Sequence, residues 1–168
     1  NAVVHHILVF VLEPNGDRQI RLDQVLVGYA PGSTPVELEP GVAMRVPKGS
    51  KLLFEMHYTP NGYAQEDRSY AGVCFVDKSQ VNKLIRGHVA INTDFEIPAK
   101  KDHHVVTADY QFAEDELLLS MTPHMHLRGK AFRYEAIYPD GTREILLDVP
   151  AYDFNWQTAY RLSEPLPL

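Results

Sequence analysis

Histidine is the residue type with the greatest chemical potential in this chain. The 168 residues include 8 histidines, 4 methionines and a single cysteine, Cys74. One cysteine cannot form a disulfide within the chain, and it rules out a zinc site built on cysteines. We therefore expect any bound metal to be held mainly by imidazole nitrogens.

The strongest metal pattern is the pair His124 and His126, separated by Met125. Residues two apart on a β-strand share a face, so both ring nitrogens can converge on one ion while Met125 points away. This spacing predicts a metal site without help from the rest of the chain. It also argues against Met125 as a ligand of the same ion.

Two other histidine positions carry weaker signals when each is taken alone. His5 and His6 are neighbours in a predicted strand and should point to opposite faces. One ion could take both rings only if the backbone leaves the pleat, or if the rings bind through different nitrogens; one surface and one core histidine is the simpler interpretation. His57 should share a strand face with Glu55, and a lone strand histidine is more often structural.

The remaining histidines and nearby aromatic residues predict ordinary structural roles. We expect His88, His103 and His104 to be structural or solvent-facing. Glu55 and Tyr58 are candidates for supporting a ligand, although strand surface and core packing explain them as well. Alternating aromatic residues near the end of the chain are typical of core packing; they are Tyr152, Phe154 and Trp156.

Composition sets the class of protein and excludes some partners. With 45% hydrophobic and 23% charged residues, the chain should fold into a globular structure. A net charge of -6 and the lack of a basic cluster argue against a nucleic-acid partner. No apolar run is long enough to span a bilayer, and no signal peptide is present. Because the sequence starts at Asn1, we expect an internal fragment or a processed chain.

Short apolar runs between turn residues predict an all-β fold with little helix. Two packed antiparallel sheets are the natural way to bury such strands. A polar stretch between Val81 and Arg86 suggests a boundary between two partial domains, 1–85 and 86–168. Turns are predicted at 13–17, 31–33 and 139–141. The predicted strands are 3–12, 24–29, 52–58, 72–76, 88–97, 105–112, 117–121, 132–138 and 144–149.

The order of the histidine motifs resembles a known enzyme family. A His-His pair, then a His-Tyr pair, then a His-x-His motif is similar to the copper type II, ascorbate-dependent monooxygenases, which include the peptidylglycine α-hydroxylating and dopamine β-monooxygenases. The resemblance runs along nearly the whole chain, and the ordered set is more specific than any one motif. Three longer strings look like bacterial members: FEMHYTPNG at 54–62, PHMHLRGK at 123–130 and YDFNWQ at 152–157.

The resemblance implies two antiparallel β-sandwich, jelly-roll-like domains that face each other across a cleft, with one copper ion in each. By position, His5, His6 and His57 correspond to the copper that stores and passes an electron. His124 and His126 correspond to two ligands of the copper that binds dioxygen and attacks the substrate. Family members complete this second site with a methionine thioether, and no methionine follows His126 in this chain.

The implied activity is hydroxylation of an aliphatic C–H bond. The resemblance implies a small-molecule or peptide substrate, O2 as oxidant, ascorbate as the reductant of both coppers, and an extracytoplasmic location, periplasmic or secreted. Imidazole and thioether ligands suit this chemistry because they tolerate both Cu(I) and Cu(II).

Three alternatives stay open at the level of sequence. The first is a non-catalytic copper-binding β-sandwich, used for sequestration or delivery. The second is a cupin-like iron or zinc enzyme that uses His124 and His126 with a carboxylate, although the next acid, Glu135, lies nine residues on at an odd spacing. The third is a structural interaction domain, which would leave the ordered histidines as coincidence.

Overall fold

The protein is almost entirely β. The computed structural model describes residues 3–14, 16, 20–30 and 33–168. Within them the helical segments are two single-turn 3-10 helices, η1 (Leu22–Gln24) and η2 (Lys78–Gln80). The predicted turns at 13–17 and 31–33 include residues outside this description. The all-β class predicted from sequence is therefore confirmed.

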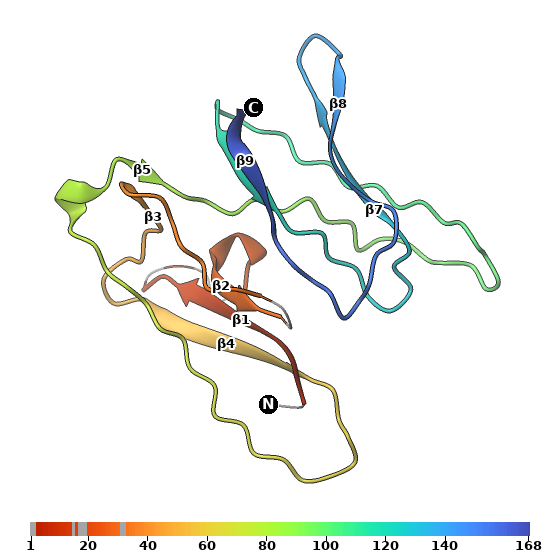
Figure 1. Ribbon diagram of the computed structural model, residues 1–168, viewed down its shortest axis with the longest axis horizontal. Coiled ribbons are helices and arrows are strands. Elements are labelled where there is room, and N and C mark those ends of the chain that lie inside the picture. Colours follow the sequence, from red (N-terminus) through yellow and green to blue (C-terminus); the bar gives the residue numbers. More distant parts are fainter. Residues whose placement is uncertain (1–2, 15, 17–19, 31–32) are drawn as a thin grey trace.

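The strands form one three-stranded sheet and three two-stranded sheets. In Figure 1 the sheet β2-β1-β4 and the pair β3–β5 belong to the red-to-green part of the chain, whereas β6–β9 and β7–β8 belong to the teal and blue part. The strands are β1 (Val4–Leu12), β2 (Val25–Tyr29), β3 (Val42–Ala43), β4 (Lys51–Tyr58), β5 (Lys83–Leu84), β6 (Leu117–Met121), β7 (Phe132–Ile137), β8 (Arg143–Val149) and β9 (Tyr160–Pro167).

The best-packed part of the molecule is the centre of β1. This strand pairs antiparallel with β2 on one side and β4 on the other. Its β-branched and aromatic run suits a central strand. Val9, Phe10 and Val11 are all buried, and the Phe10 side chain is 0% exposed. Because successive strand residues point to opposite faces, both faces of β1 are covered here.

The second half of the chain contains two antiparallel pairs. β7 and β8 form a hairpin whose predicted turn at 139–141 is confirmed: Tyr138 N–H donates to Thr142 C=O at 2.9 Å, and Gly141 has a φ of 85°. A positive φ of this size favours glycine. β6 pairs with β9, and Met121 at the end of β6 is buried.

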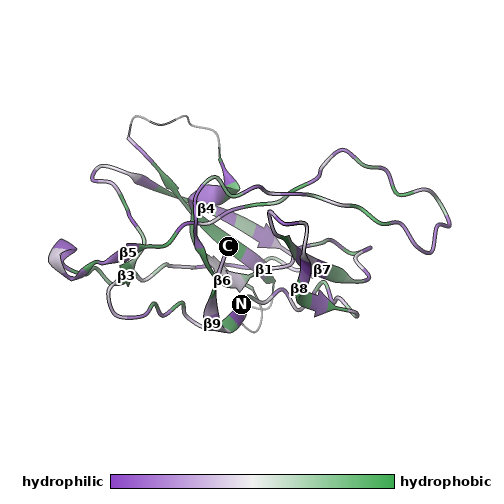
Figure 2. Cartoon of the chain, turned by 90° about the horizontal axis from the view of Figure 1, so that it is seen from above, coloured by the Kyte–Doolittle hydropathy of each residue, from purple (hydrophilic) through white to green (hydrophobic). Residues whose placement is uncertain are grey.

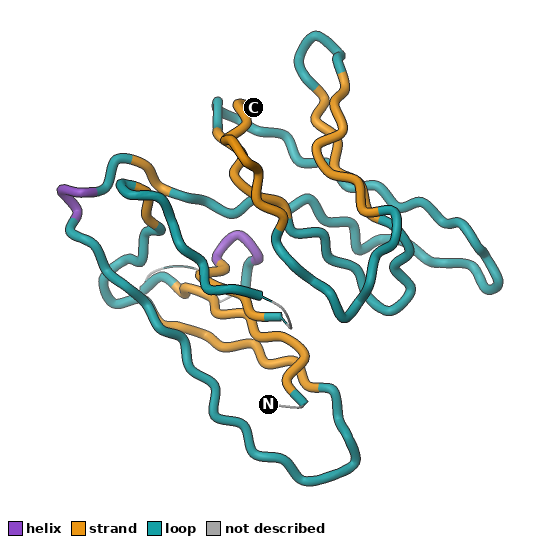
Figure 3. Tube along the Cα trace, in the orientation of Figure 1, coloured by secondary structure: helices purple, strands orange, loops and turns teal. Residues whose placement is uncertain are grey.

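Three predicted strands are wrong, namely 72–76, 88–97 and 105–112. These segments have no ladder partner among the described residues and are loops (teal in Figure 3). The last two are linked by a side chain, since Asn92 Nδ2 donates to the Thr107 carbonyl at 2.9 Å. An apolar run favours extended backbone, but a strand also needs a neighbour for its hydrogen bonds. Figure 2 shows hydrophobic and hydrophilic residues interleaved along the long extended loop that projects from the molecule.

The structure also contains strands that the sequence did not predict. β3 and β5 pair in parallel, an exception to the expected antiparallel pairing, and β5 lies inside the polar stretch predicted as a boundary. β9 contains Pro165 and Pro167, which argue against a central strand; it pairs only with β6 among the described strands, and an edge tolerates proline. No helix in the described ranges is long and apolar enough to cross a membrane.

Candidate metal centre

A β-bulge at His5 brings two adjacent histidines to the same place. Val4 pairs with Tyr58 and His6 pairs with His57, so His5 is the extra residue of the ladder. A bulge bends the strand and redirects its side chains. As a result the Nδ1 atoms of His5 and His6 lie 2.8 Å apart. The backbone leaves the regular pleat at this pair, which is one of the two conditions under which one ion could take both rings.

His57 joins this pair from the neighbouring strand. As the direct cross-strand partner of His6 it faces the same side of the sheet. The two rings are stacked, with centroids 3.9 Å apart and an interplanar angle of 22°. His57 Nε2 donates to Glu55 Oε1 at 2.6 Å, as expected if the two side chains share a face. We call His5, His6 and His57 the first histidine group.

His124 and His126, the second histidine group, lie in a loop and not on the strand assumed from their spacing. β6 ends at Met121, and Pro123 has no N–H with which to extend the ladder. The two rings nevertheless lie close together, with centroids 5.2 Å apart at 84°. His124 also contacts His6, with ring centroids 6.2 Å apart. All five predicted ligands therefore form one continuous set of ring contacts.

Side chains from distant residues hold the second group in place. The Tyr152 hydroxyl accepts from Met125 N–H at 2.9 Å and donates to Met125 C=O at 2.8 Å, which pins the backbone between the two histidines. The Tyr134 hydroxyl donates to the Thr122 carbonyl at 3.0 Å. Burial raises the pKa of Tyr152, so its hydroxyl keeps the proton that it donates.

Gly129 permits the close packing of this loop. A Cβ at this position would lie 2.8 Å from both Met125 Cβ and Tyr152 Cδ1, and 3.1 Å from the His126 carbonyl oxygen. Gly129 N–H donates to that same carbonyl at 2.8 Å and closes the turn after the histidines. The loop therefore has no room for a side chain here.

The segment 152–157 supports both groups, which corrects the core-packing role predicted for its aromatic residues. Phe154 stacks on His5 with ring centroids 4.5 Å apart at 18°. Gln157 Oε1 accepts from His124 Nδ1 at 2.7 Å. Trp156 is 58% exposed and is not a core residue. Alternation alone could not show these contacts, although the YDFNWQ string was already part of the family resemblance.

The electrostatics of the cluster favour neutral imidazole, the form that binds metal. The pKa of His6 is lowered from 6.5 to about 4. Partial burial of the ring is the largest cause, and the nearby His57, His5 and His124 rings contribute the rest of the lowering. Partial desolvation also lowers the pKa of His124, while its hydrogen bond to Gln157 acts in the opposite direction. Both rings therefore carry a free lone pair at neutral pH.

The donor set fits an imidazole-bound metal. Two nitrogens 2.8 Å apart can both reach one ion, because metal–nitrogen bonds are about 2.0 Å long. The Nε2 atom of His5 is buried and has no hydrogen-bond partner among the described residues, a costly arrangement for a polar atom. In the described part of the chain, no three histidine, cysteine or acidic side chains are arranged so that together they could hold one metal ion. Binding of one ion through three rings therefore requires the histidine side chains to rearrange.

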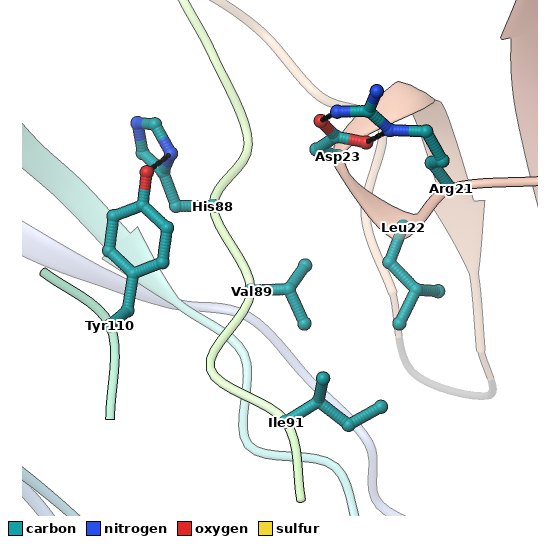
Figure 4. A pocket seen from close by; sticks show the side chains of 7 residues that line it. All are labelled: Arg21, Leu22, Asp23, His88, Val89, Ile91 and Tyr110. Atoms are coloured by element: carbon teal, nitrogen blue, oxygen red, sulfur yellow. Dashed lines mark hydrogen bonds and ion pairs between the residues drawn. The ribbon is translucent and has the colours of Figure 1, made fainter. Parts of the chain in front are cut away.

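The other histidines lie outside this cluster. His103 and His104 are exposed, as expected. His88 has a structural role, which is one of the two predicted for it: its Nε2 donates to Glu116 Oε2 at 2.8 Å, and the Tyr110 hydroxyl donates to its Nδ1 at 2.6 Å. His88 and Tyr110 line an open hollow of about 440 Å³ whose opposite wall carries the Arg21–Asp23 ion pair (Figure 4). Tyr58, a predicted supporting residue, donates to Asp67 instead.

Compared with known proteins, the chain matches no protein-family model, no curated protein and no solved structure.

Proposed function

We propose that this chain carries the histidine ligands of a copper-dependent monooxygenase, an oxidoreductase that hydroxylates an aliphatic C–H bond with O2 and an ascorbate-type reductant. The observation that supports it is the convergence of all five predicted ligands. The ring centroid of His6 lies 3.9 Å from that of His57 and 6.2 Å from that of His124, although His124 is more than a hundred residues away in sequence. Five imidazoles in one contact network, three of them exposed to solvent, form a nitrogen-rich site of the kind that binds metal ions.

Copper bound by these imidazoles would supply one-electron transfer and the activation of O2. The chain's own residues perform the positioning. The bulge at His5 aims two rings at one point, and Glu55 holds His57 as the tautomer with a proton on Nε2, which leaves Nδ1 unprotonated. Tyr152 fixes the backbone between His124 and His126. Hydrogen bonds of this kind orient metal ligands and raise their basicity.

We also propose that residues 1–85 and 86–168 are parts of two β-sandwich, jelly-roll-like domains that face each other at the histidines. In support, the three-stranded sheet carries the first group, whereas the second group follows β6 in a separate pair of strands. The contact between His6 and His124 joins the two parts. Two copper ions, a small-molecule or peptide substrate and an extracytoplasmic location complete the proposal on the strength of the family resemblance.

A non-catalytic copper-binding protein is the second candidate, and one observation favours it. The second group offers two histidines, and among the described residues no third histidine, cysteine or acidic side chain joins them to hold one ion. Such a protein would bind copper through the same rings but would not consume O2 when ascorbate is added. Ascorbate-driven O2 uptake by the copper-loaded chain therefore separates the two candidates.

Copper titration followed by electron paramagnetic resonance of the Cu(II) form tests the proposal. We expect two nitrogen-ligated type II signals in the wild-type chain. His57→Ala should remove the signal of the first group, and His124→Ala should remove that of the second.

His103→Ala is the matched control, because His103 is exposed and lies outside the cluster. It should leave both signals unchanged. Weak copper binding, together with spectra that neither His57→Ala nor His124→Ala alters, would contradict the proposed function.

A further inference from the structure

The orientation of the Gln157 amide can be deduced from its two hydrogen bonds. Its Nε2 group donates to the Phe154 carbonyl oxygen at 2.8 Å. A carbonyl oxygen only accepts, so the NH2 end of the amide must face Phe154 and the oxygen end must face His124. The Gln157 Oε1 atom lies 2.7 Å from His124 Nδ1.

This orientation fixes the proton on the His124 ring. An amide oxygen can only accept, so Nδ1 of His124 must be the protonated nitrogen. In a neutral imidazole the other nitrogen, Nε2, then keeps its lone pair. The nitrogen available to a ligand is thus set by a residue 33 positions further along the chain.

The turn that carries Gln157 is itself well ordered by local bonds. Asp153 Oδ1 accepts from Asn155 N–H at 2.8 Å, and Trp156 N–H donates to the Asp153 carbonyl at 3.0 Å. The ring of Phe154, in the same turn, stacks on His5 at 4.5 Å. One short segment therefore contacts a histidine from each group.

We propose that Gln157 is a positioning residue that holds His124 as the Nδ1–H tautomer and presents its Nε2 atom to a metal, from a turn that also seats His5. The metal part of this inference rests on the proposed function. The tautomer part does not, because it concerns the protein without metal.

Long-range ¹H–¹⁵N correlation spectroscopy of the metal-free protein tests the tautomer directly, since it distinguishes protonated from unprotonated ring nitrogens. In the wild type we expect His124 to carry its proton on Nδ1. Gln157→Leu removes the acceptor and should shift the proton to Nε2. Gln157→Glu keeps an acceptor oxygen and should retain the Nδ1–H form, while Gln111→Leu, at an exposed glutamine, is the control.

A wild-type His124 protonated on Nε2 would overturn the inference, and this result requires no variant to fold. An unchanged Nδ1–H form in Gln157→Leu would overturn it as well. A copper titration then tests the second part. Gln157→Leu should weaken copper binding at the second group by about 10- to 100-fold, whereas Gln157→Glu should not.

The two experiments separate the inference from the function. If the tautomer changes as expected but no copper binds, the proposed function fails and the role of Gln157 in ordering His124 stands. If two copper signals appear but Gln157→Leu changes neither the tautomer nor the affinity, the function stands and the inference fails.

Discussion

The two histidine groups are positioned by different means. The first group sits on paired strands, where the ladder between β1 and β4 places His6 opposite His57 and a bulge redirects His5. The second group sits in a loop held by side chains from residues far along the sequence, above all Tyr152 and Gln157. A site on a ladder inherits the stability of its sheet, whereas a site on a loop depends on a few individual bonds.

The largest effect should come from breaking the core that supports the first group. Phe10→Ala removes the one fully buried large side chain among the described residues and should cost about 3–5 kcal/mol of unfolding free energy. Urea denaturation measures this loss. Phe95→Ala, at a residue that is 49% exposed, should change stability by less than about 0.5 kcal/mol. Equal effects of the two substitutions would show that β1 is not the structural centre.

A smaller effect is expected from crowding the loop of the second group. Gly129→Ala places a methyl group 2.8 Å from Met125 Cβ and from Tyr152 Cδ1. This overpacking should lower the unfolding free energy by about 1–3 kcal/mol. The fluorescence of Trp156, the single tryptophan of the chain, reports on this region. Amide hydrogen exchange in β1 should change less than in the loop, because the ladder hydrogen bonds of β1 are made with β2 and β4.

Gly72→Ala is the matched control for that substitution, since a Cβ at Gly72 meets nothing within 4 Å. It should leave both Trp156 fluorescence and stability near the wild type. If Gly129→Ala behaves in the same way, the close packing of the loop is not needed.

Removing one hydroxyl should loosen the second group without disturbing the first. Tyr152→Phe leaves the N–H and C=O of Met125 without the oxygen that bridges them. The loss of these two hydrogen bonds should lower the unfolding free energy by about 1–2 kcal/mol. Copper affinity of the second group should fall, while the signal of the first group stays. Loss of both signals to the same degree would mean that the two groups are not independently supported.

A fall in pH should lower the stability of the metal-free protein, because of the low pKa of His6. The pKa of His6 is about 4 in the folded protein against 6.5 for an unperturbed histidine. Between these values the unfolded chain takes up a proton that the folded chain does not, so the unfolding free energy of the metal-free protein should fall as pH falls from about 6.5 to about 4. His6→Gln, which cannot titrate, should show a smaller fall.

An NMR titration of the metal-free protein checks the origin of that pH effect. The His6 ring should titrate near pH 4, and it should titrate at higher pH in His57→Ala, which removes its stacked neighbour. A His6 ring that titrates near 6.5 in the wild type would contradict the crowding of the first group.

The sequence predicted much of what local patterns can encode. Six strands follow from apolar runs and turn residues, and alternation correctly placed Glu55 beside His57. Three other apolar runs have no strand partner within the described part of the chain, because pairing depends on what lies alongside and not on the run itself. A ladder such as β3–β5, two residues long, leaves no detectable pattern.

The candidate site likewise has a part that could be predicted from the sequence and a part that could not. All five histidines could be named from their motifs, because spacing and order are properties of the sequence. The supporting bonds could not be predicted, since the contact of Tyr152 with Met125 joins residues 27 positions apart and Gln157 reaches His124 over 33 positions. The bulge at His5 was needed to bring adjacent rings together, and its position depends on the register with β4.

X-ray absorption at the copper edge of the copper-loaded chain tests the central claim most directly, because it identifies the atoms around the metal. We expect a first shell of nitrogen at about 2.0 Å, the outer-shell scattering typical of imidazole, and no sulfur. A sulfur ligand from Cys74 or a methionine, or an oxygen shell without imidazole scattering, would contradict the assignment of the five histidines as the metal ligands.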